Sequence, residues 1–111
     1  MDRDKTKRIA SLNDLARTAM GVACRLVQTP GISALPQSEQ SAIREKVETF
    51  SEFTAENDPY GERDFGAFEH SGEGIFWKID YYNATLTAGS EDPSDPKHTI
   101  RVLTIMLATE Y

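Results

Sequence analysis

The sequence is poor in the features that crosslink a protein or place it in a membrane. Cys24 is the only cysteine among 111 residues, so it has no partner for a disulfide within the chain. No apolar run approaches the roughly 18 residues that a membrane span needs. The first residues, MDRDKTKR, have no apolar segment behind their charges, which argues against a secretory signal. These absences favour a cytoplasmic protein, and Cys24, inside the apolar segment VACRLV, is expected in its core.

Motifs that identify a reaction are also missing. The phosphate-binding patterns GxxxxGK[ST] and GxGxxG do not occur, and neither do the metal-binding patterns HExxH and DxDxDG. We therefore predict no catalytic residue, no metal and no cofactor. A non-enzymatic role is expected for this chain.

Positive charge is scarce in the middle of the chain. The net charge is −6, but residues 39–95 hold fourteen Asp and Glu against four Lys and Arg, a local charge of −10. Residues 1–25 hold six Lys and Arg against three Asp. Because phosphates would be repelled by the acidic middle, we expect no direct binding of nucleic acid there. A basic protein partner remains compatible with this charge.

The first half of the chain predicts two helices with a strand between them. Residues 4–20 form the first helix, and residues 22–29 form a strand that the turn formers Pro30 and Gly31 close. The second helix starts at Pro36 and ends at Asn57-Asp58-Pro59. The first helix has the apolar stripe Ile9, Leu12, Leu15, Ala16 and Ala19. The second has the apolar face Ile43, Val47, Phe50 and Thr54, opposite the acidic face Glu45, Glu48, Glu52 and Glu56.

The segment from residue 53 to 82 is the aromatic centre of the sequence and predicts an antiparallel hairpin. Residues 64–70 and 75–82 are its strands, joined by a turn at residues 71–74. Residues 84–88 could add a short fourth strand. One face of the second hairpin strand holds Ile75, Trp77, Ile79 and Tyr81, which should meet the helices. The other face holds Phe76, Lys78, Asp80 and Tyr82, and we expect it to be partly covered.

A third helix is predicted at the C-terminus. Asp95 can cap it, Pro96 suits its first turn, and Ile100, Leu103, Met106 and Leu107 follow at helical spacing. The expected fold is a single α+β domain over residues 1–111: a small antiparallel sheet of three or four strands packed with three helices.

Three segments, NDPYGERDFGAFE, FWKIDYY and RVLTIMLATEY, resemble a family known as a domain of unknown function. The resemblance covers roughly residues 9–111. Its members are small bacterial proteins, often encoded near plasmid or other mobile-element genes. No activity, cofactor or catalytic residue comes with this resemblance. In the family pattern a His commonly stands where this chain has Arg63, so the resemblance supports no metal or acid–base role at that position.

A cluster of carboxylates in residues 58–80 offers the alternative of a small metal-dependent hydrolase. Its members are Asp58, Glu62, Asp64, Glu69, His70 and Asp80. A structural role is preferred for them: Asp58 as a turn residue, and Asp80 paired with Lys78 or Arg63 or bonded to a tyrosine hydroxyl. His70 and His98 are expected on the surface. The aromatic residues Phe65, Phe68, Phe76, Trp77, Tyr81 and Tyr82 have mainly acidic neighbours, which favours core or a protein contact over RNA.

The preferred function is a protein-binding module, in its most concrete form an inhibitor of a host nucleic-acid-targeting system of the anti-restriction or anti-CRISPR type. The expected partner is a basic, nucleic-acid-binding protein, with no membrane and no direct nucleic acid involved. A structural accessory acting by homo-oligomerisation is a further alternative. The candidate contact residues are Glu45, Glu48, Glu52, Glu56, Asp58, Tyr60, Glu62, Arg63, Asp64, Phe76 and Tyr82.

Overall fold

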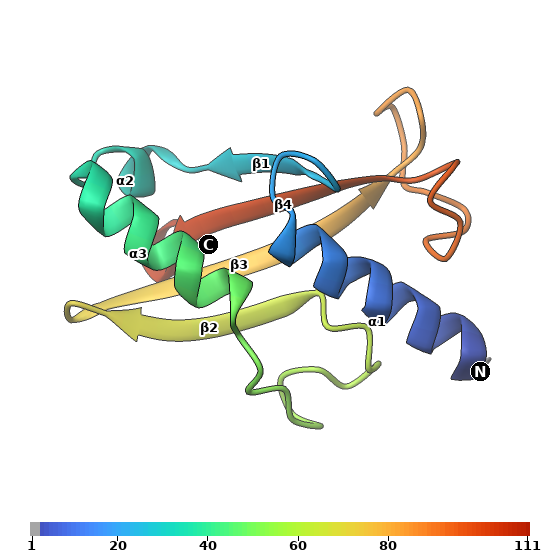
Figure 1. Ribbon diagram of the computed structural model, residues 1–111, viewed down its shortest axis with the longest axis horizontal. Coiled ribbons are helices and arrows are strands. Elements are labelled where there is room, and N and C mark those ends of the chain that lie inside the picture. Colours follow the sequence, from blue (N-terminus) through green and yellow to red (C-terminus); the bar gives the residue numbers. More distant parts are fainter. Residues whose placement is uncertain (1–2) are drawn as a thin grey trace.

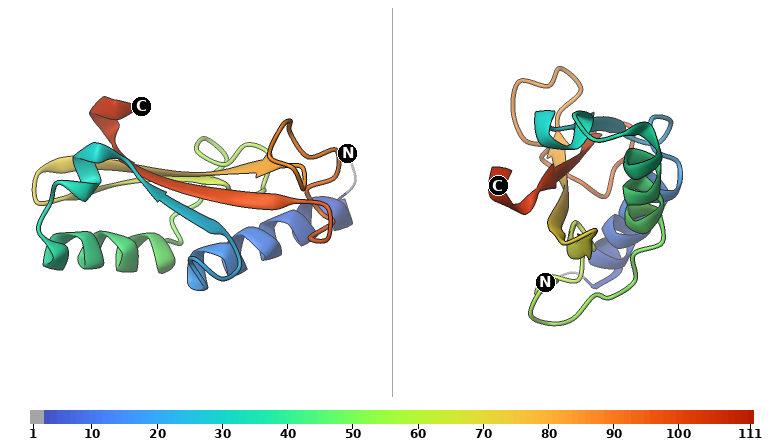
Figure 2. Two further views of the ribbon diagram at one scale, coloured as in Figure 1. Left: turned by 90° about the horizontal axis from the view of Figure 1, so that it is seen from above. Right: turned by 90° about the vertical axis from the view of Figure 1, so that its left-hand side faces the viewer.

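The fold is a four-stranded sheet with its two long helices on one face (Figures 1 and 2). The computed structural model describes residues 3–111. In chain order the elements are α1 (Arg3–Thr18), β1 (Arg25–Gln28), α2 (Pro30–Ser33), α3 (Gln37–Glu48), β2 (Phe65–His70), β3 (Glu73–Tyr82), β4 (Ile100–Leu107) and the short 3-10 helix η1 (Ala108–Glu110). The strand order is β1-β4-β3-β2. Figure 2 shows α1 and α3 on one side of the sheet and the C-terminal turn on the other.

The predicted α+β class is confirmed, and the sheet itself is mixed rather than antiparallel. The pairs β2–β3 and β3–β4 are antiparallel, whereas β1 runs parallel to β4. A parallel pair needs a long crossover, and here α2, α3 and the hairpin all lie between β1 and β4 in the chain. The predicted strand over residues 22–29 shrinks to Arg25–Gln28, and Pro30 opens the one-turn helix α2 instead of a simple turn.

The predicted C-terminal helix is wrong, because Ile100–Leu107 is strand β4 at the centre of the sheet. The segment IRVLTIML is apolar at almost every position, so its apolar residues also fall at helical spacing. A strand between two neighbours makes use of β-branched residues such as Val102 and Thr104, whose branched side chains disfavour a helix. Pairing with β1 on one side and β3 on the other decides between the two structures.

The predicted hairpin and its two faces are confirmed, but its turn is shorter than the predicted residues 71–74, because Glu73 and Gly74 belong to β3. Ser71 and Gly72 adopt φ values of 51° and 82° between the paired residues His70 and Glu73. Such a two-residue turn with positive φ matches the twist of antiparallel strands. On the inner face Ile75, Trp77 and Ile79 are buried and Tyr81 is half-buried, while Phe76, Lys78, Asp80 and Tyr82 on the outer face are partly covered, as predicted.

Trp77 is the centre of the core. Its side chain is fully buried, and the rings of Phe50 and Phe53 meet it edge-on at centroid distances of 5.6 and 6.1 Å. Its indole lies against Gly66, the opposite residue of β2, where a side chain would not fit. Cys24 is buried in the same core, as predicted.

The second predicted helix is shorter than expected, because α3 ends at Glu48. Arg17 of α1, only 4% exposed, donates hydrogen bonds of 2.9 Å to the carbonyl oxygens of Val47 and Phe50. This side chain therefore satisfies carbonyls at the end of the helix, and the chain leaves it so that Phe50 and Phe53 can reach Trp77. As a result Glu52 and Glu56 do not lie on a helix, and the four glutamates do not form one helical face.

The buried face of α1 also differs from the predicted apolar stripe. Ile9 and Ala16 are buried, but Leu15 is 52% exposed. Asn13 and Arg17 are buried in its place, at 0% and 4% exposure. The reason is that polar groups of the sheet and of α3 provide partners for these two side chains, as described below.

The segment between β3 and β4 forms loops at one end of the sheet (Figure 1). The predicted strand over residues 84–88 is absent there: residues 84–88 form a turn followed by a bend, with Leu86 at a φ of 59°, and the pairing in this loop is a single bridge between Tyr82 and Gly89. In the part of the chain that the structure describes, the helices are too short or too polar to cross a bilayer.

Candidate functional site

Seven of the predicted contact residues lie together in the segment of residues 52–64, which we call the acidic loop. Its own side chains hold it in shape. The Asn57 Oδ1 accepts the backbone N–H of Thr54 at 2.8 Å, and Asn57 Nδ2 donates to the Glu52 carbonyl at 2.9 Å. The Asp58 Oδ1 accepts the backbone N–H of Arg63 at 3.0 Å, which confirms the turn role predicted for Asp58. Tyr60 lies between Asp58 and Arg63 in the chain, and 67% of its surface is exposed.

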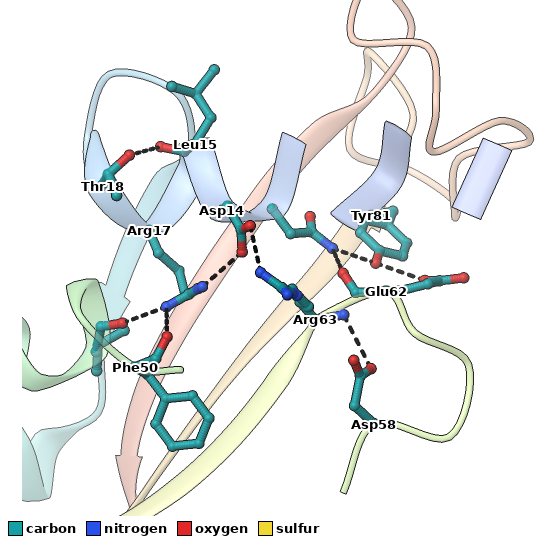
Figure 3. Close-up of polar contacts among 11 residues, drawn as sticks. Asp14, Leu15, Arg17, Thr18, Phe50, Asp58, Glu62, Arg63 and Tyr81 are labelled. Atoms are coloured by element: carbon teal, nitrogen blue, oxygen red, sulfur yellow. Dashed lines mark hydrogen bonds and ion pairs between the residues drawn. The ribbon is translucent and has the colours of Figure 1, made fainter. Parts of the chain in front are cut away.

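The acidic loop is held against α1 and β3 by hydrogen bonds that Figure 3 shows. Arg63 Nη1 pairs with the Asp14 carboxylate at 2.9 Å, and the same carboxylate pairs with Arg17 at 2.7 Å. The Tyr81 hydroxyl donates to Glu62 Oε1 at 2.8 Å. The loop is therefore connected to α1, far away in the sequence, and to β3.

Asn13 joins these contacts inside the protein. Its Nδ2 donates to the Tyr81 hydroxyl at 2.8 Å and to the Glu62 carbonyl at 2.9 Å, and its Oδ1 accepts Arg101 Nε at 2.7 Å. Burial raises the pKa of Tyr81 and lowers that of Arg101. Neither Asn13 nor Arg101 was predicted from the sequence as part of this site. The signal for the burial of Asn13 was its helical spacing between Ile9 and Ala16, which puts this polar residue on the same side of the helix as they are.

The carboxylates of residues 58–80 are divided between two ends of the hairpin. At one end, burial raises the pKa of Asp64, and the nearby charges of Glu62, Asp58 and Asp80 raise it further. Asp80 forms an ion pair of 2.9 Å with Lys78, one of the partners considered for it. Throughout residues 3–111, no three His, Cys, Asp or Glu side chains converge as ligands of a metal ion would.

Glu69 and His70 lie at the other end of the hairpin, beside α3. His70 Nε2 contacts the Glu39 carboxylate, and the Lys46 amine donates to His70 Nδ1 at 3.0 Å. The His70 side chain is only 12% exposed, so the prediction of a simply exposed histidine is wrong. Its position between Glu39 and Lys46 of the helix explains the burial. His98 is exposed as predicted and pairs with Asp95 at 2.6 Å.

Glu45 and Glu48 are exposed on the last turns of α3, and the exposed Glu52 and Glu56 follow in the acidic loop. No described side chain forms a hydrogen bond or ion pair with these four carboxylates. The acidic loop and the end of α3 thus form a continuous stretch of chain in which negative charge faces water, although its geometry differs from the predicted helical face.

Phe76 and Tyr82, the remaining predicted contact residues, lie on the opposite face of the sheet. The Phe76 ring meets Phe65 and Tyr111 edge-on, each at 5.4 Å between centroids, and 74% of Tyr111 is exposed. The predicted contact residues therefore belong to two surfaces: an acidic one beside the helices and an aromatic one on the outer face of the sheet.

Comparison with known proteins places the chain in a family without assigning an activity. No curated protein and no solved structure matches it. Residues 28–110 match the family described as Protein of unknown function (DUF3768). Because that match spans most of the chain, and agrees with the resemblance to a domain of unknown function, the protein belongs to this family.

Proposed function

We propose that the protein is a non-enzymatic, protein-binding module that acts in the cytoplasm on a basic, nucleic-acid-binding partner. The observation that supports this is an imbalance in the charge pairing of residues 39–95. All four basic side chains of this segment are engaged: Arg63 with Asp14, Lys78 with Asp80, Arg44 with Gln28 and Ser41, and Lys46 with His70.

The glutamates of the same segment are mostly not engaged. In the described part of the chain, some glutamate carboxylates form neither a hydrogen bond nor an ion pair. They are those of Glu45, Glu48, Glu52, Glu56, Glu69, Glu73 and Glu91. Because Arg63 and Lys78 are paired with carboxylates, and fourteen Asp and Glu of this segment face only four Lys and Arg, the segment presents a net negative charge outward. Such a surface attracts a partner rich in Lys and Arg and speeds its association.

The acidic loop gives this surface a fixed shape. Asn57 and Asp58 hold its backbone, and Arg63 and Glu62 attach it to the rest of the fold. A loop that is already ordered loses less conformational entropy on binding. Tyr60, exposed at its tip, is a residue type that is enriched in protein interfaces.

In its most concrete form, the protein inhibits a nucleic-acid-targeting system, in the manner of an anti-restriction or anti-CRISPR protein. A groove that binds phosphates with Lys and Arg also attracts a surface dense in carboxylates, so the two compete. The mobile-element setting implied by the family resemblance is consistent with this form of the proposal.

The test is a comparison of two variants. In the first, Glu45→Gln, Glu48→Gln, Glu52→Gln and Glu56→Gln together remove four negative charges at exposed positions. In the second, Glu91→Gln removes an exposed carboxylate from the loops at the other end of the sheet. Each is used with the wild type in a pull-down from the native host, and the affinity of the recovered protein is measured at low and physiological salt.

We expect the wild type and Glu91→Gln to retain a basic, nucleic-acid-binding protein that the quadruple variant loses. We also expect the salt dependence of its affinity to become weaker in the quadruple variant, and nucleic acid to displace the wild type. Equal affinity of all three proteins at both salts would refute the role of the acidic surface. Equal melting temperatures serve as the control for folding.

A further inference from the structure

In residues 3–111, no long helix covers the outer face of the sheet, although this face carries apolar side chains (Figure 2). Both α1 and α3 lie on the inner side, while the short C-terminal turn lies on the outer side, where Tyr111 contacts Phe76. Strand β4 contributes Ile100 and Val102 to the outer face, and β1 contributes Val27, of which 44% is exposed. Apolar side chains gathered in this way indicate a contact surface.

The charges on the outer face balance one another. Strand alternation places two basic and two acidic side chains on it, those of Arg25, Lys78, Glu69 and Asp80. Lys78 and Asp80 form an ion pair of 2.9 Å on β3, and their side chains are 40% and 38% exposed. A basic partner is attracted to the acidic surface beside the helices, not to this neutral face. A face with both signs of charge suits a surface of the same composition, such as the outer face of a second copy.

The outward residues of β3 are complementary to themselves. In chain order they are the aromatic Phe76, the cation Lys78, the anion Asp80 and the aromatic Tyr82. A twofold axis across the middle of this segment would place Lys78 of one copy opposite Asp80 of the other, and Phe76 opposite Tyr82. The β3–β4 register pairs Lys78 with Thr104 and Asp80 with Val102, so the same axis would place Val102 opposite Thr104. Such self-complementarity is what a twofold interface requires.

We propose that the protein forms a twofold-symmetric dimer through this outer face, with β3 packed on β3 of a second copy. The eight residues of β4 make the face about 27 Å long, and four strands make it about 19 Å wide. This is about 500 Å² per copy before the relief of the side chains is added, close to the roughly 600 Å² per partner of the smaller specific interfaces. The dimer is therefore expected to be reversible, with a Kd of about 1–100 μM.

The dimer leaves the acidic surface of each copy free, because that surface lies beside the helices on the inner side. This inference does not rest on the proposed function, and it adds to it: two acidic surfaces on one particle bind a partner with two basic sites more tightly than one does.

The first experiment measures the mass of the intact protein by analytical ultracentrifugation from about 1 to 300 μM, at about 0.15 M salt. We expect the wild type to pass from monomer to dimer over this range. Lys78→Glu would bring four carboxylates together at the contact, and Asp80→Lys would bring four amines together, so each should raise the Kd at least about tenfold. Lys7→Glu makes the same charge change as Lys78→Glu at an exposed position of α1, and it should dimerise like the wild type.

The decisive measurement is an equimolar mixture of Lys78→Glu and Asp80→Lys. The acidic pair of the first variant would face the basic pair of the second, so the mixture should form a heterodimer although neither variant dimerises alone. Loss of the Lys78–Asp80 pair within one chain cannot produce this result.

A wild type that stays monomeric at every concentration would overturn the proposal. A dimer that persists in both single variants would place the contact on another surface, and a mixture that stays monomeric would also overturn it. If either variant loses the circular dichroism spectrum of the wild type, Thr104→Arg decides the test. This change adds charge and bulk to the same face while the Lys78–Asp80 pair stays in place, and dimerisation that survives it would refute the interface.

Discussion

Replacing Gly66 with alanine should disrupt the core directly at Trp77. Gly66 pairs with Trp77 across the β2–β3 ladder, and its side of the strand faces the indole. A Cβ added at Gly66 would lie 2.3 Å from Trp77 Nε1 and 2.6 Å from Cε2. Non-bonded carbon atoms prefer separations of about 3.5–4.0 Å, so one of the two residues must move by more than about 1 Å.

The surroundings of Trp77 leave little room for that movement. The side chain is fully buried, the rings of Phe50 and Phe53 pack against it in a T-shaped geometry, and the Arg17 guanidinium lies 5.0 Å from the centre of its ring. Inserting a methyl group into a core of this kind costs about 1–3 kcal/mol of folding free energy. Because the neighbours are themselves fixed by packing and hydrogen bonds, we expect the upper part of that range.

The assay is urea unfolding of Gly66→Ala and wild type, followed by far-UV circular dichroism. We expect a lower midpoint with an unchanged slope, and a decrease in melting temperature of several degrees for each kcal/mol. Gly89→Ala is the matched control, because the atom nearest to its added Cβ is a backbone oxygen at 3.8 Å, an ordinary contact. Gly89→Ala should change the free energy of unfolding by less than about 0.5 kcal/mol.

A double-mutant cycle identifies the cause. Trp77→Phe removes the indole nitrogen that the new methyl group would meet, so Gly66→Ala should cost less in that background by about 1 kcal/mol. If Gly66→Ala and Gly89→Ala destabilise the protein equally, or if the cycle shows no coupling, the packing described for Gly66 and Trp77 is wrong.

Three further outcomes are expected. Tyr81→Phe, which removes hydrogen bonds to Glu62 and Asn13, should lower the free energy of unfolding by about 1 kcal/mol, and an unchanged urea midpoint would contradict the buried network. The Glu110 carboxylate has a pKa below its ordinary 4.5, first because it accepts the Thr29 hydroxyl. The stability it adds is therefore present above pH 4.5 and lost as pH falls through the lower folded pKa, so Glu110→Gln should destabilise at pH 7 and have little effect in strong acid. A pH-independent difference in urea midpoint would contradict this. Dialysis against a chelator should leave the melting temperature unchanged, because residues 3–111 present no converging set of metal ligands, and a fall that one cation restores would contradict that reading.

The proposed acidic contact surface shows how an error in the predicted end of one helix changes a predicted site. The charges of Glu45, Glu48, Glu52 and Glu56 are readable from the sequence, and so is their exposure. Their arrangement is not, because it depends on where α3 ends. That end depends on Arg17, about thirty residues earlier, which binds the carbonyl oxygens of Val47 and Phe50.

By itself, the sequence determined the features that depend on neighbouring residues. The hairpin follows from its turn formers and its alternating pattern, the first helix from its periodicity, and the loop structure at Asn57 and Asp58 from side chains that bond nearby backbone. The burial of Trp77 follows from the same alternation, since one face of the strand had to meet the helices.

Only the tertiary structure decided what depends on distant partners. Ile100–Leu107 is apolar at nearly every position and suits a helix or a strand, and it becomes a strand because β1 and β3 pair with it on both sides. Asn13 and Arg101 look like surface residues in the sequence, and they are buried because distant parts of the chain supply their hydrogen-bond partners, among them the bond from Arg101 Nε to Asn13 Oδ1 across 88 positions. A polar group is buried without a large cost only where a hydrogen-bond partner is present, and the position of that partner is set by the whole fold.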